Sequence, residues 1–132
     1  MVKMVEIQAE IDKTEFLKHR TRFTTNEEEE KAFSTLSRYR DGGIFAGGFS
    51  GESAWERHSQ GDEMVQVLDG EADLTILEGN TPEVLHIQKG MLVVVPKGLW
   101  HRFHAPQGVT LMTVTPEPTD ISTLDYPPDE GQ

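Results

Sequence analysis

Short apolar segments separated by closely spaced turn signals are the feature that most constrains the fold of this chain. From Asp41 to Thr115 the runs between turns are too short and too evenly spaced for the helices of a parallel α/β fold. The pattern therefore predicts an all-β sandwich or jelly-roll barrel. The turn signals are Gly42-Gly43, Gly47-Gly48, Asp69-Gly70, Glu78-Gly79-Asn80, Lys89-Gly90, Pro96-Lys97-Gly98 and Pro106-Gln107-Gly108.

The expected strands cover residues 44–49, 54–58, 64–68, 72–77, 84–87, 91–95, 101–105 and 109–115. Before them, rough alternation from Val2 to Ile11 predicts a further strand. Asn26, followed by four glutamates that suit the positive end of a helix, predicts a short N-terminal helix running to about Tyr39. We expect the glutamates to form a solvated first turn and assign them no function.

The end of the chain differs in composition from the rest. The segment from Pro116 to Gln132 contains four prolines and five acidic residues. This composition predicts an extended or partly disordered arm, with Leu124 and Tyr126 as anchors. With 132 residues in all, we expect a single domain over residues 1–118 and an acidic, proline-rich arm over 119–132.

Composition excludes several classes of function. The chain has 23 acidic residues against 12 Lys and Arg, a formal net charge of −11. Nucleic acid and anionic membrane surfaces are therefore not expected partners. The chain has no cysteine, so a metal site must use His, Asp or Glu. The N-terminal residues lack a signal-peptide core and no segment is long enough for a membrane span, so we expect a cytoplasmic protein.

Two separate segments concentrate the groups that could carry chemistry. On an expected strand, Glu56 and His58 share one face while Arg57 points to the other. A tight turn follows, and Glu63 begins the returning strand, where it could project beside His58. Much later, a turn at residues 96–98 leads into a strand that begins near His101. The fold could therefore bring His58, Glu63 and His101 to one point.

These residues also have plainer interpretations. His58 and His101 could be buried structural histidines, and Glu63 a carboxylate bonded to backbone amides. Burying three such groups at metal-ligand spacing would be costly without a cation, so we favour a metal site. Glu56 could be a ligand, a base facing a substrate, or a surface acid. The other histidines, His19, His86 and His104, have no partnered spacing and are expected to be ordinary surface or supporting residues.

The two segments resemble the two motifs of the cupin superfamily. The first reads Glu56-Arg57-His58, four residues, Glu63, six residues and Gly70. Here Glu56 stands where the family has its first His. The second reads Gly90, five residues, Pro96, one residue, Gly98, two residues and His101, with Ala105 in place of the family's final Asn. The resemblance covers about residues 42–115, and two motifs at a normal separation are more specific than either alone.

The resemblance implies a small single-domain cupin, a double-stranded β-helix or jelly-roll barrel, here with a short N-terminal helix. It also implies a divalent metal ion inside the barrel. The corresponding ligands would be Glu56, His58, Glu63 and His101. Two carboxylates and two imidazoles form a harder, more anionic site than three histidines would, so we expect iron or manganese, with zinc and nickel as alternatives.

The expected function is metal-dependent action on a small molecule. Dioxygenase-like chemistry is one candidate, and isomerisation or decarboxylation with Glu56 as the base is another. The alternatives from other classes are a noncatalytic barrel that binds a small ligand, and a mainly structural protein that pairs residues 2–11 across a homodimer. A homodimer is expected, with no nucleic acid or membrane partner.

Overall fold

The computed structural model describes residues 2–128. Two short helices, α1 (Ile7–Asp12) and α2 (Asn26–Ala32), lie near the start of the chain. The strands are β1 (Leu17–Arg20), β2 (Phe33–Tyr39), β3 (Gly42–Glu52), β4 (Trp55–His58), β5 (Glu63–Glu78), β6 (Thr81–Gln88), β7 (Leu92–Val95), β8 (His101–Pro116) and β9 (Thr119–Ser122). Neither helix in this part of the chain is long and apolar enough to cross a membrane.

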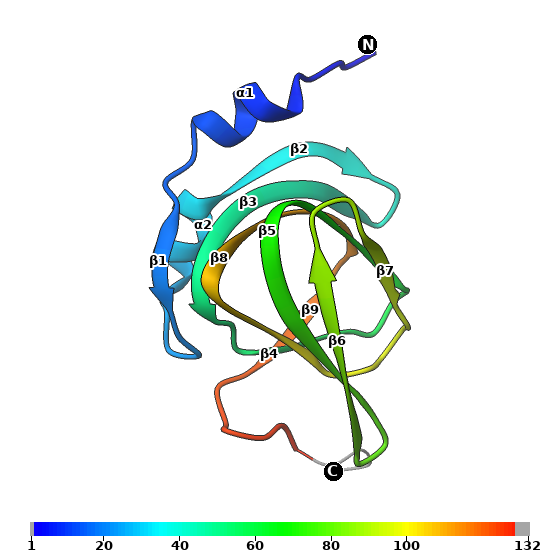
Figure 1. Ribbon diagram of the computed structural model, residues 1–132. Coiled ribbons are helices and arrows are strands. Elements are labelled where there is room, and N and C mark those ends of the chain that lie inside the picture. Colours follow the sequence, from blue (N-terminus) through cyan, green and yellow to red (C-terminus); the bar gives the residue numbers. More distant parts are fainter. Residues whose placement is uncertain (1, 129–132) are drawn as a thin grey trace.

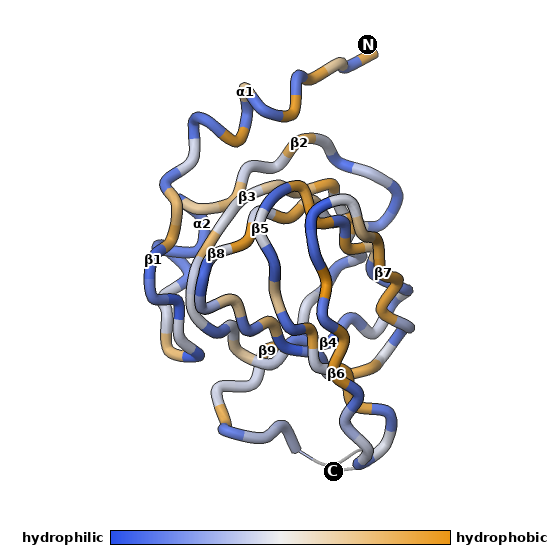
Figure 2. Tube along the Cα trace, in the orientation of Figure 1, coloured by the Kyte–Doolittle hydropathy of each residue, from blue (hydrophilic) through white to orange (hydrophobic). Residues whose placement is uncertain are grey.

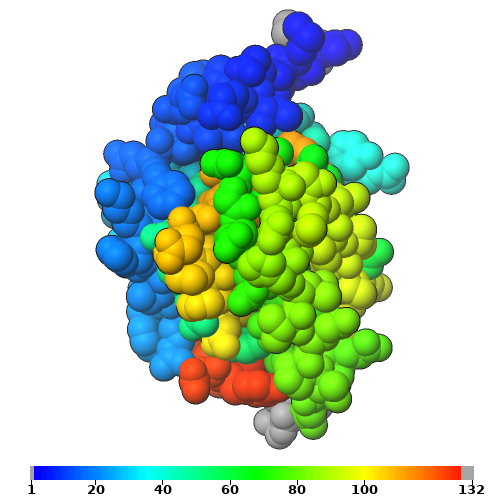
Figure 3. Space-filling model, in the orientation of Figure 1, coloured from blue at the N-terminus to red at the C-terminus, as the bar shows by residue number. Residues whose placement is uncertain are grey.

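The strands form one sheet that curls around a common interior, as Figure 1 shows. Its main path is β1-β3-β8-β4-β9, β2 pairs with β3, and β5 pairs with β6, β7 and β8. The long strands β3, β5 and β8 make the backbone of the barrel: β8 pairs with β3 along one side and with β5 along the other. In the space-filling view α1 lies at one end and the tail at the other (Figure 3). The predicted jelly-roll cupin barrel with a short N-terminal helix is confirmed.

Along the strands of the barrel, buried side chains alternate with more exposed ones. In the first part of β5, buried residues alternate with half-buried ones, and Figure 2 shows mixed hydropathy along the same strand. Because successive side chains point to opposite faces, one face of each strand lines the interior. The main core cluster fills part of that interior with apolar side chains from five strands, including Phe49, Val65, Leu74, Phe103 and Leu111.

The predicted strand from Val2 to Ile11 is wrong, since the structure has α1 there. The Glu6 side chain accepts a hydrogen bond from the Ala9 amide at 2.6 Å, which starts the helix. No residue of α1 is buried and Ile7 is 37% exposed, so the alternation has no buried face to support it. The homodimer that this strand was expected to build loses its proposed pairing, and the dimer itself stays a prediction.

The helix predicted from Asn26 to Tyr39 is confirmed in its first half only. It begins as expected, although Thr25 is the N-cap and forms a capping box with Glu28. It ends at Ala32, and residues 33–39 become β2, which pairs with β3 over its whole length. Pairing with a neighbouring strand here outweighs the weak helical pattern of Ala32, Phe33 and Leu36.

Two pairs of expected strands merge, and the tail adds another. Residues 64–68 and 72–77 belong to β5, whose register shifts around Gly70, and residues 101–105 and 109–115 belong to β8. After residue 118 the chain forms β9, which pairs with β4. Of the two expected anchors, Tyr126 packs its ring 5.8 Å from that of Trp55, whereas Leu124 is 56% exposed. Residues 129–132 lie outside the described part.

Candidate metal centre

Two of the candidate side chains lie two residues apart on β4 and therefore point to the same face of the strand. Glu56 and His58 occupy alternate positions of β4, and Glu56 is the register partner of His101, the first residue of β8. His58 and His101 are 3% and 1% exposed, and their ring centroids are 5.2 Å apart. Chain segments more than 40 residues apart thus place two imidazoles side by side inside the barrel.

Glu63, the first residue of β5, lies between the two imidazoles. Its Oε1 is 3.1 Å from Nε2 of His101, and its Oε2 is 3.3 Å from Nε2 of His58. The Thr115 hydroxyl donates a hydrogen bond to Oε2 at 2.7 Å. The carboxylate is 5% exposed, so its charge is satisfied from inside the barrel.

The other ring nitrogen of His101 fixes what its Nε2 can do. Nδ1 lies 3.0 Å from the backbone carbonyl of Leu99, and because a carbonyl only accepts, Nδ1 carries a proton. In a neutral His101, Nε2 would then direct its lone pair at the Glu63 carboxylate 3.1 Å away. Two acceptors at this separation require a cation between or beside them, either a proton on Nε2 or a metal ion.

His58 has a similar need. Its Nδ1 contacts the Thr119 hydroxyl at 3.1 Å. Its buried Nε2 has no hydrogen-bond partner among the described residues, although Glu63 is close. A buried ring nitrogen without a partner is costly unless something else binds it. Both imidazoles therefore present an Nε2 atom that a metal ion would satisfy.

The donor set fits a divalent ion. Ligand atoms of Glu56, His58 and His101 all lie within 4.8 Å of one another. Neighbouring ligands about 2.1 Å from an octahedral ion are about 3.0 Å apart, and the contacts of Glu63 with the two imidazoles are close to that spacing. Glu63 contacts both histidines, whereas Glu56 completes the group with them from β4. Oxygen and imidazole ligands suit iron, manganese, zinc or nickel.

The same contacts shift the ionisation of the cluster. Burial raises the pKa of the Glu63 carboxyl, but the contacts with His101 and His58 outweigh burial and lower the pKa to about 2. Burial lowers the pKa of His101, but its hydrogen bond to Glu63 and the negative charge there outweigh burial and raise it. In the metal-free protein these shifts favour an ionised Glu63 and a protonated His101.

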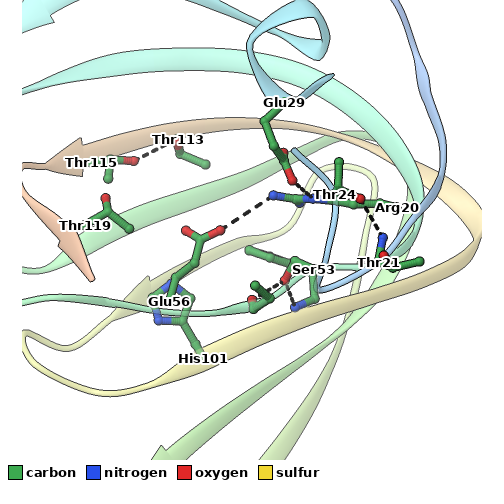
Figure 4. A network of polar contacts seen from close by, with 12 residues as sticks. Arg20, Thr21, Thr24, Glu29, Ser53, Glu56, His101, Thr113, Thr115 and Thr119 are labelled. Atoms are coloured by element: carbon green, nitrogen blue, oxygen red, sulfur yellow. Dashed lines mark hydrogen bonds and ion pairs between the residues drawn. The ribbon is translucent and has the colours of Figure 1, made fainter. Parts of the chain in front are cut away.

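A second cluster of charged side chains, formed by Arg20 and Glu29, lies next to the histidine cluster and contacts Glu56. Arg20, from β1, donates from Nε to Oε1 of Glu29 at 2.8 Å, and its Nη2 lies 3.6 Å from Oε1 of Glu56. Figure 4 shows Arg20 reaching between the two glutamates, with Glu56 next to His101. The guanidinium also lies 4.5 Å from the ring centroid of Phe49. Arg20 is 8% exposed, whereas the two glutamates are about a quarter exposed, so this ion-pair network is partly buried.

Gly51 allows Arg20 to reach this position. Gly51 has φ of 103°, and a Cβ there would collide with the backbone carbonyl of Arg20. β1 pairs with β3 at this point, with Arg20 opposite Gly51. The close approach of the two backbones brings a side chain from β1 to the opening of the barrel.

A pocket of about 200 Å³ adjoins the candidate ligands. Glu56 and Glu63 line it on the polar side, together with Arg20, Glu29 and three threonines. Its apolar wall consists of Phe33, Phe45, Phe49, Phe103 and Leu111. The volume is below the usual range for drug-sized ligands, so the pocket suits only a compact molecule, and the mixed lining is typical of a small-molecule site.

The structure brings all four sequence-predicted residues to this region, with Glu56 also 3.6 Å from Arg20. Arg57 pairs with Asp120. His19, His86 and His104 are exposed, as expected. Sequence reasoning missed Thr115, Thr119, Arg20 and Glu29. Only Thr115 had a signal, because it lies at the end of a predicted strand in register with buried positions.

Comparisons with known proteins agree with this geometry. The cupin domain family matches residues 45–115, more than half of the chain. The chain belongs to the cupin family. A comparison with curated proteins found no match. The resemblance of the two motifs to cupins is thus confirmed.

Several solved structures share the cupin fold. Protein NMB1881 from Neisseria meningitidis is 15% identical with a TM-score of 0.62, and the match covers 91% of this chain and 100% of that one. Hydroquinone 1,2-dioxygenase from Sphingomonas sp. TTNP3 is 19% identical with a TM-score of 0.57, over 63% of this chain and 64% of that one. Oxalate decarboxylase from Lactobacillus farciminis is 14% identical with a TM-score of 0.54, over 60% and 26%.

This cupin spans less than two thirds of the dioxygenase and about a quarter of the decarboxylase. At these identities the likeness concerns the fold alone. The shared fold is a barrel whose interior, in this chain, contains two histidines next to two glutamates that line a small pocket.

Proposed function

We propose that this cupin binds one divalent metal ion through Glu56, His58, Glu63 and His101, and acts on a small molecule in the adjoining pocket. The observation that carries the proposal is the buried Nε2 of His101, which faces the Glu63 carboxylate at 3.1 Å while Nδ1 is committed to a carbonyl. The buried Nε2 of His58, without a hydrogen-bond partner in residues 2–128, supports it. Because two of the four ligands are carboxylates, we expect iron or manganese.

Dioxygenase-like chemistry is the first candidate. A bound ion would supply Lewis-acid or redox chemistry to a substrate that meets it in the pocket. The residues of the chain would hold and orient the reactants: Thr115 and Thr119 fix Glu63 and His58, and the phenylalanine wall excludes water from the apolar part of the pocket. The fold shared with hydroquinone 1,2-dioxygenase is compatible with this candidate.

Isomerisation or decarboxylation is the second candidate, and the position of Glu56 favours it. Glu56 is 3.6 Å from Arg20 and lines the pocket, so its carboxylate can accept a proton from a bound molecule if it does not bind the ion. In that case Glu56 is the base, and His58, Glu63 and His101 hold the metal. The same geometry also allows a noncatalytic binding barrel, which turnover measurements distinguish from both enzymes.

Metal analysis of the purified protein tests the proposal. The wild type and a His58→Ala/His101→Ala double variant would be stripped with a chelator and loaded in turn with Fe²⁺, Mn²⁺, Ni²⁺ and Zn²⁺. We expect about one ion per chain in the wild type and a loss of affinity of about 100-fold or more in the variant. A His86→Ala/His104→Ala variant removes two exposed histidines and is the matched control.

The control should bind the metal as the wild type does. If the wild type retained no more of any ion than the His58→Ala/His101→Ala variant, the metal centre would be excluded. A Glu56→Gln variant then separates the two roles of Glu56. If Glu56 is a ligand, the variant should bind the metal more weakly. If Glu56 is the base, the variant should bind the metal as the wild type does and lose turnover.

A further inference from the structure

We propose that the metal-loaded pocket selects uncharged molecules about the size of a single ring, and that Arg20 and Glu29 set this charge selectivity. The inference rests on the proposed metal centre and deepens it by naming the class of substrate. It assigns a role to two residues of the N-terminal elements β1 and α2, outside the residues that match the cupin family.

The pocket is small, and its lining is divided into an apolar and a polar side. Its volume is about 200 Å³, and an engineered apolar cavity of about 150 Å³ is known to accept benzene. One wall is apolar and largely aromatic, and the threonines at 113, 115 and 119 lie on the polar side. A compact ring with one oxygen that reaches the metal fits this division better than a flexible or strongly polar molecule.

Acidic side chains outnumber basic ones in the lining of the pocket. Glu29, Glu56 and Glu63 contribute three negative charges, and Arg20 contributes one positive charge. The imidazoles that bind an ion are neutral. A divalent ion therefore brings the formal sum to zero. A neutral molecule preserves this balance, whereas an anion would add an uncompensated negative charge to a partly enclosed, low-dielectric site.

Arg20 already contacts two carboxylates. A buried arginine beside a pocket would ordinarily predict recognition of a carboxylate or phosphate. Here its Nε is hydrogen-bonded to Glu29 at 2.8 Å, and its Nη2 faces Glu56 at 3.6 Å (Figure 4). The guanidinium also covers the face of Phe49. Two carboxylates thus compensate the cation before any ligand enters, and Glu29 is the closer of the two.

The ion-pair network borders a second pocket as well. Arg20, Glu29, Glu56 and Thr119 line the pocket beside the candidate ligands and also a neighbouring pocket of about 320 Å³. A molecule that moves from one pocket to the other must pass these four side chains. The charge of the network therefore acts on a molecule in either pocket.

Binding of a matched pair of probes tests the selectivity. The protein loaded with Mn²⁺ would be titrated at pH 7 with 4-hydroxybenzamide and with 4-hydroxybenzoate, which differ mainly in charge, by calorimetry. We expect the wild type to bind the amide about tenfold tighter or more. Because the carboxylate of the second probe is itself able to bind a metal ion, this comparison is biased against the proposal.

The Glu29→Gln variant identifies the source of the selectivity. It removes one negative charge and leaves Arg20 with a free N–H, so the preference for the amide should fall about fivefold or more. Glu30→Gln, the same change at an exposed position one residue along α2, is the control and should keep the wild-type preference. Circular dichroism and bound Mn²⁺ would be measured for both variants.

Two outcomes would overturn the inference while leaving the metal centre in place. One is that the Mn²⁺-loaded wild type binds 4-hydroxybenzoate as tightly as the amide, or binds neither probe. The other is that Glu29→Gln and Glu30→Gln show the same preference. The wild-type comparison decides the selectivity even if Glu29→Gln fails to fold. Failure of the wild type to retain Mn²⁺ or any other ion would overturn the proposed function, and the inference with it.

Discussion

Two imidazole–carboxylate clusters of this cupin differ mainly in burial. Inside the barrel, His101 lies 3.1 Å from Glu63, and both residues are almost fully buried. On the surface, His86 lies 2.8 Å from Asp73 and 3.8 Å from Glu71, and these side chains are about half exposed. The shorter contact belongs to the cluster without an expected function. Proximity of His and carboxylate alone therefore does not identify a metal site; desolvation and second partners do.

The partners of the ring nitrogens sharpen this contrast. In the buried cluster a carbonyl holds Nδ1 of His101, and Thr115 holds one oxygen of Glu63, so each group has one orientation. In the surface cluster water can satisfy whatever the protein does not. Four predictions follow the comparison from its largest expected effect to its smallest.

Removal of the buried carboxylate should have the largest effect. In the metal-free protein, Glu63→Ala leaves two buried imidazoles and the Thr115 hydroxyl without their shared partner, and we expect a loss of about 3–5 kcal/mol in the free energy of unfolding. Urea unfolding in the presence of a chelator measures it. Asp73→Ala is the surface counterpart, and equal losses in the two variants would contradict the role given to burial.

Acid should destabilise the metal-free protein through the same carboxylate. The pKa of Glu63 is lowered to about 2 in the folded protein, against about 4.3 in an unfolded chain. A lowered pKa contributes stability that is present above the unfolded value and is lost as pH falls through the folded value. We expect a loss of about 3 kcal/mol between roughly pH 4.5 and pH 2.

The outcome is read from urea midpoints of the metal-free protein at a series of pH values. The raised pKa of His101 has the opposite sign, because its contribution is lost as pH rises through the folded value. Stability should therefore be greatest between the two transitions. A midpoint that does not change from pH 4.5 to pH 2 would show that Glu63 is not held ionised by the histidines.

The hydroxyl that supports Glu63 should have an intermediate effect. Thr115→Val keeps the shape of the side chain but removes the 2.7 Å hydrogen bond to the carboxylate, at a cost of about 1.5–3 kcal/mol, typical of hydrogen bonds to charged groups. Metal affinity should also fall, because Glu63 loses its fixed orientation. Thermal and urea unfolding measure the first effect and metal titration the second. Unchanged metal affinity would limit Thr115 to a structural role.

The surface histidine should have the smallest effect. His86→Ala removes a short contact with Asp73, yet both side chains are exposed to solvent, and we expect no measurable change in the free energy of unfolding. Metal binding should be unaffected. A large loss of either property would show that the two clusters are energetically alike.

The buried cluster could be predicted from the sequence because the patterns that indicate it lie within short segments. The spacing of Glu56 and His58 on a strand, and the turns before Glu63 and His101, are properties of short segments. The strands of the barrel were recovered for the same reason, although breaks were predicted within β5 and β8 where the register only shifts.

The remaining parts of the site depend on contacts between distant segments. Arg20 reaches the pocket because β1 pairs with β3 beside Gly51, and Thr119 reaches His58 because β9 pairs with β4. No pattern near either residue predicts its partner. The strand expected at residues 2–11 failed for a related reason: alternation predicts a strand only where a neighbouring strand and a buried face are present.

The pairing of β4 has a consequence for any shortened form of the protein. β4 carries Glu56 and His58, yet it shares a single register pair with β8 and four with β9. The backbone carbonyl of Asp125, farther along the tail, accepts a hydrogen bond from the Trp55 ring at the start of β4. A chain that ended at residue 118 would retain every proposed ligand. It would still lose β9, the main pairing partner of β4, which positions Glu56 and His58.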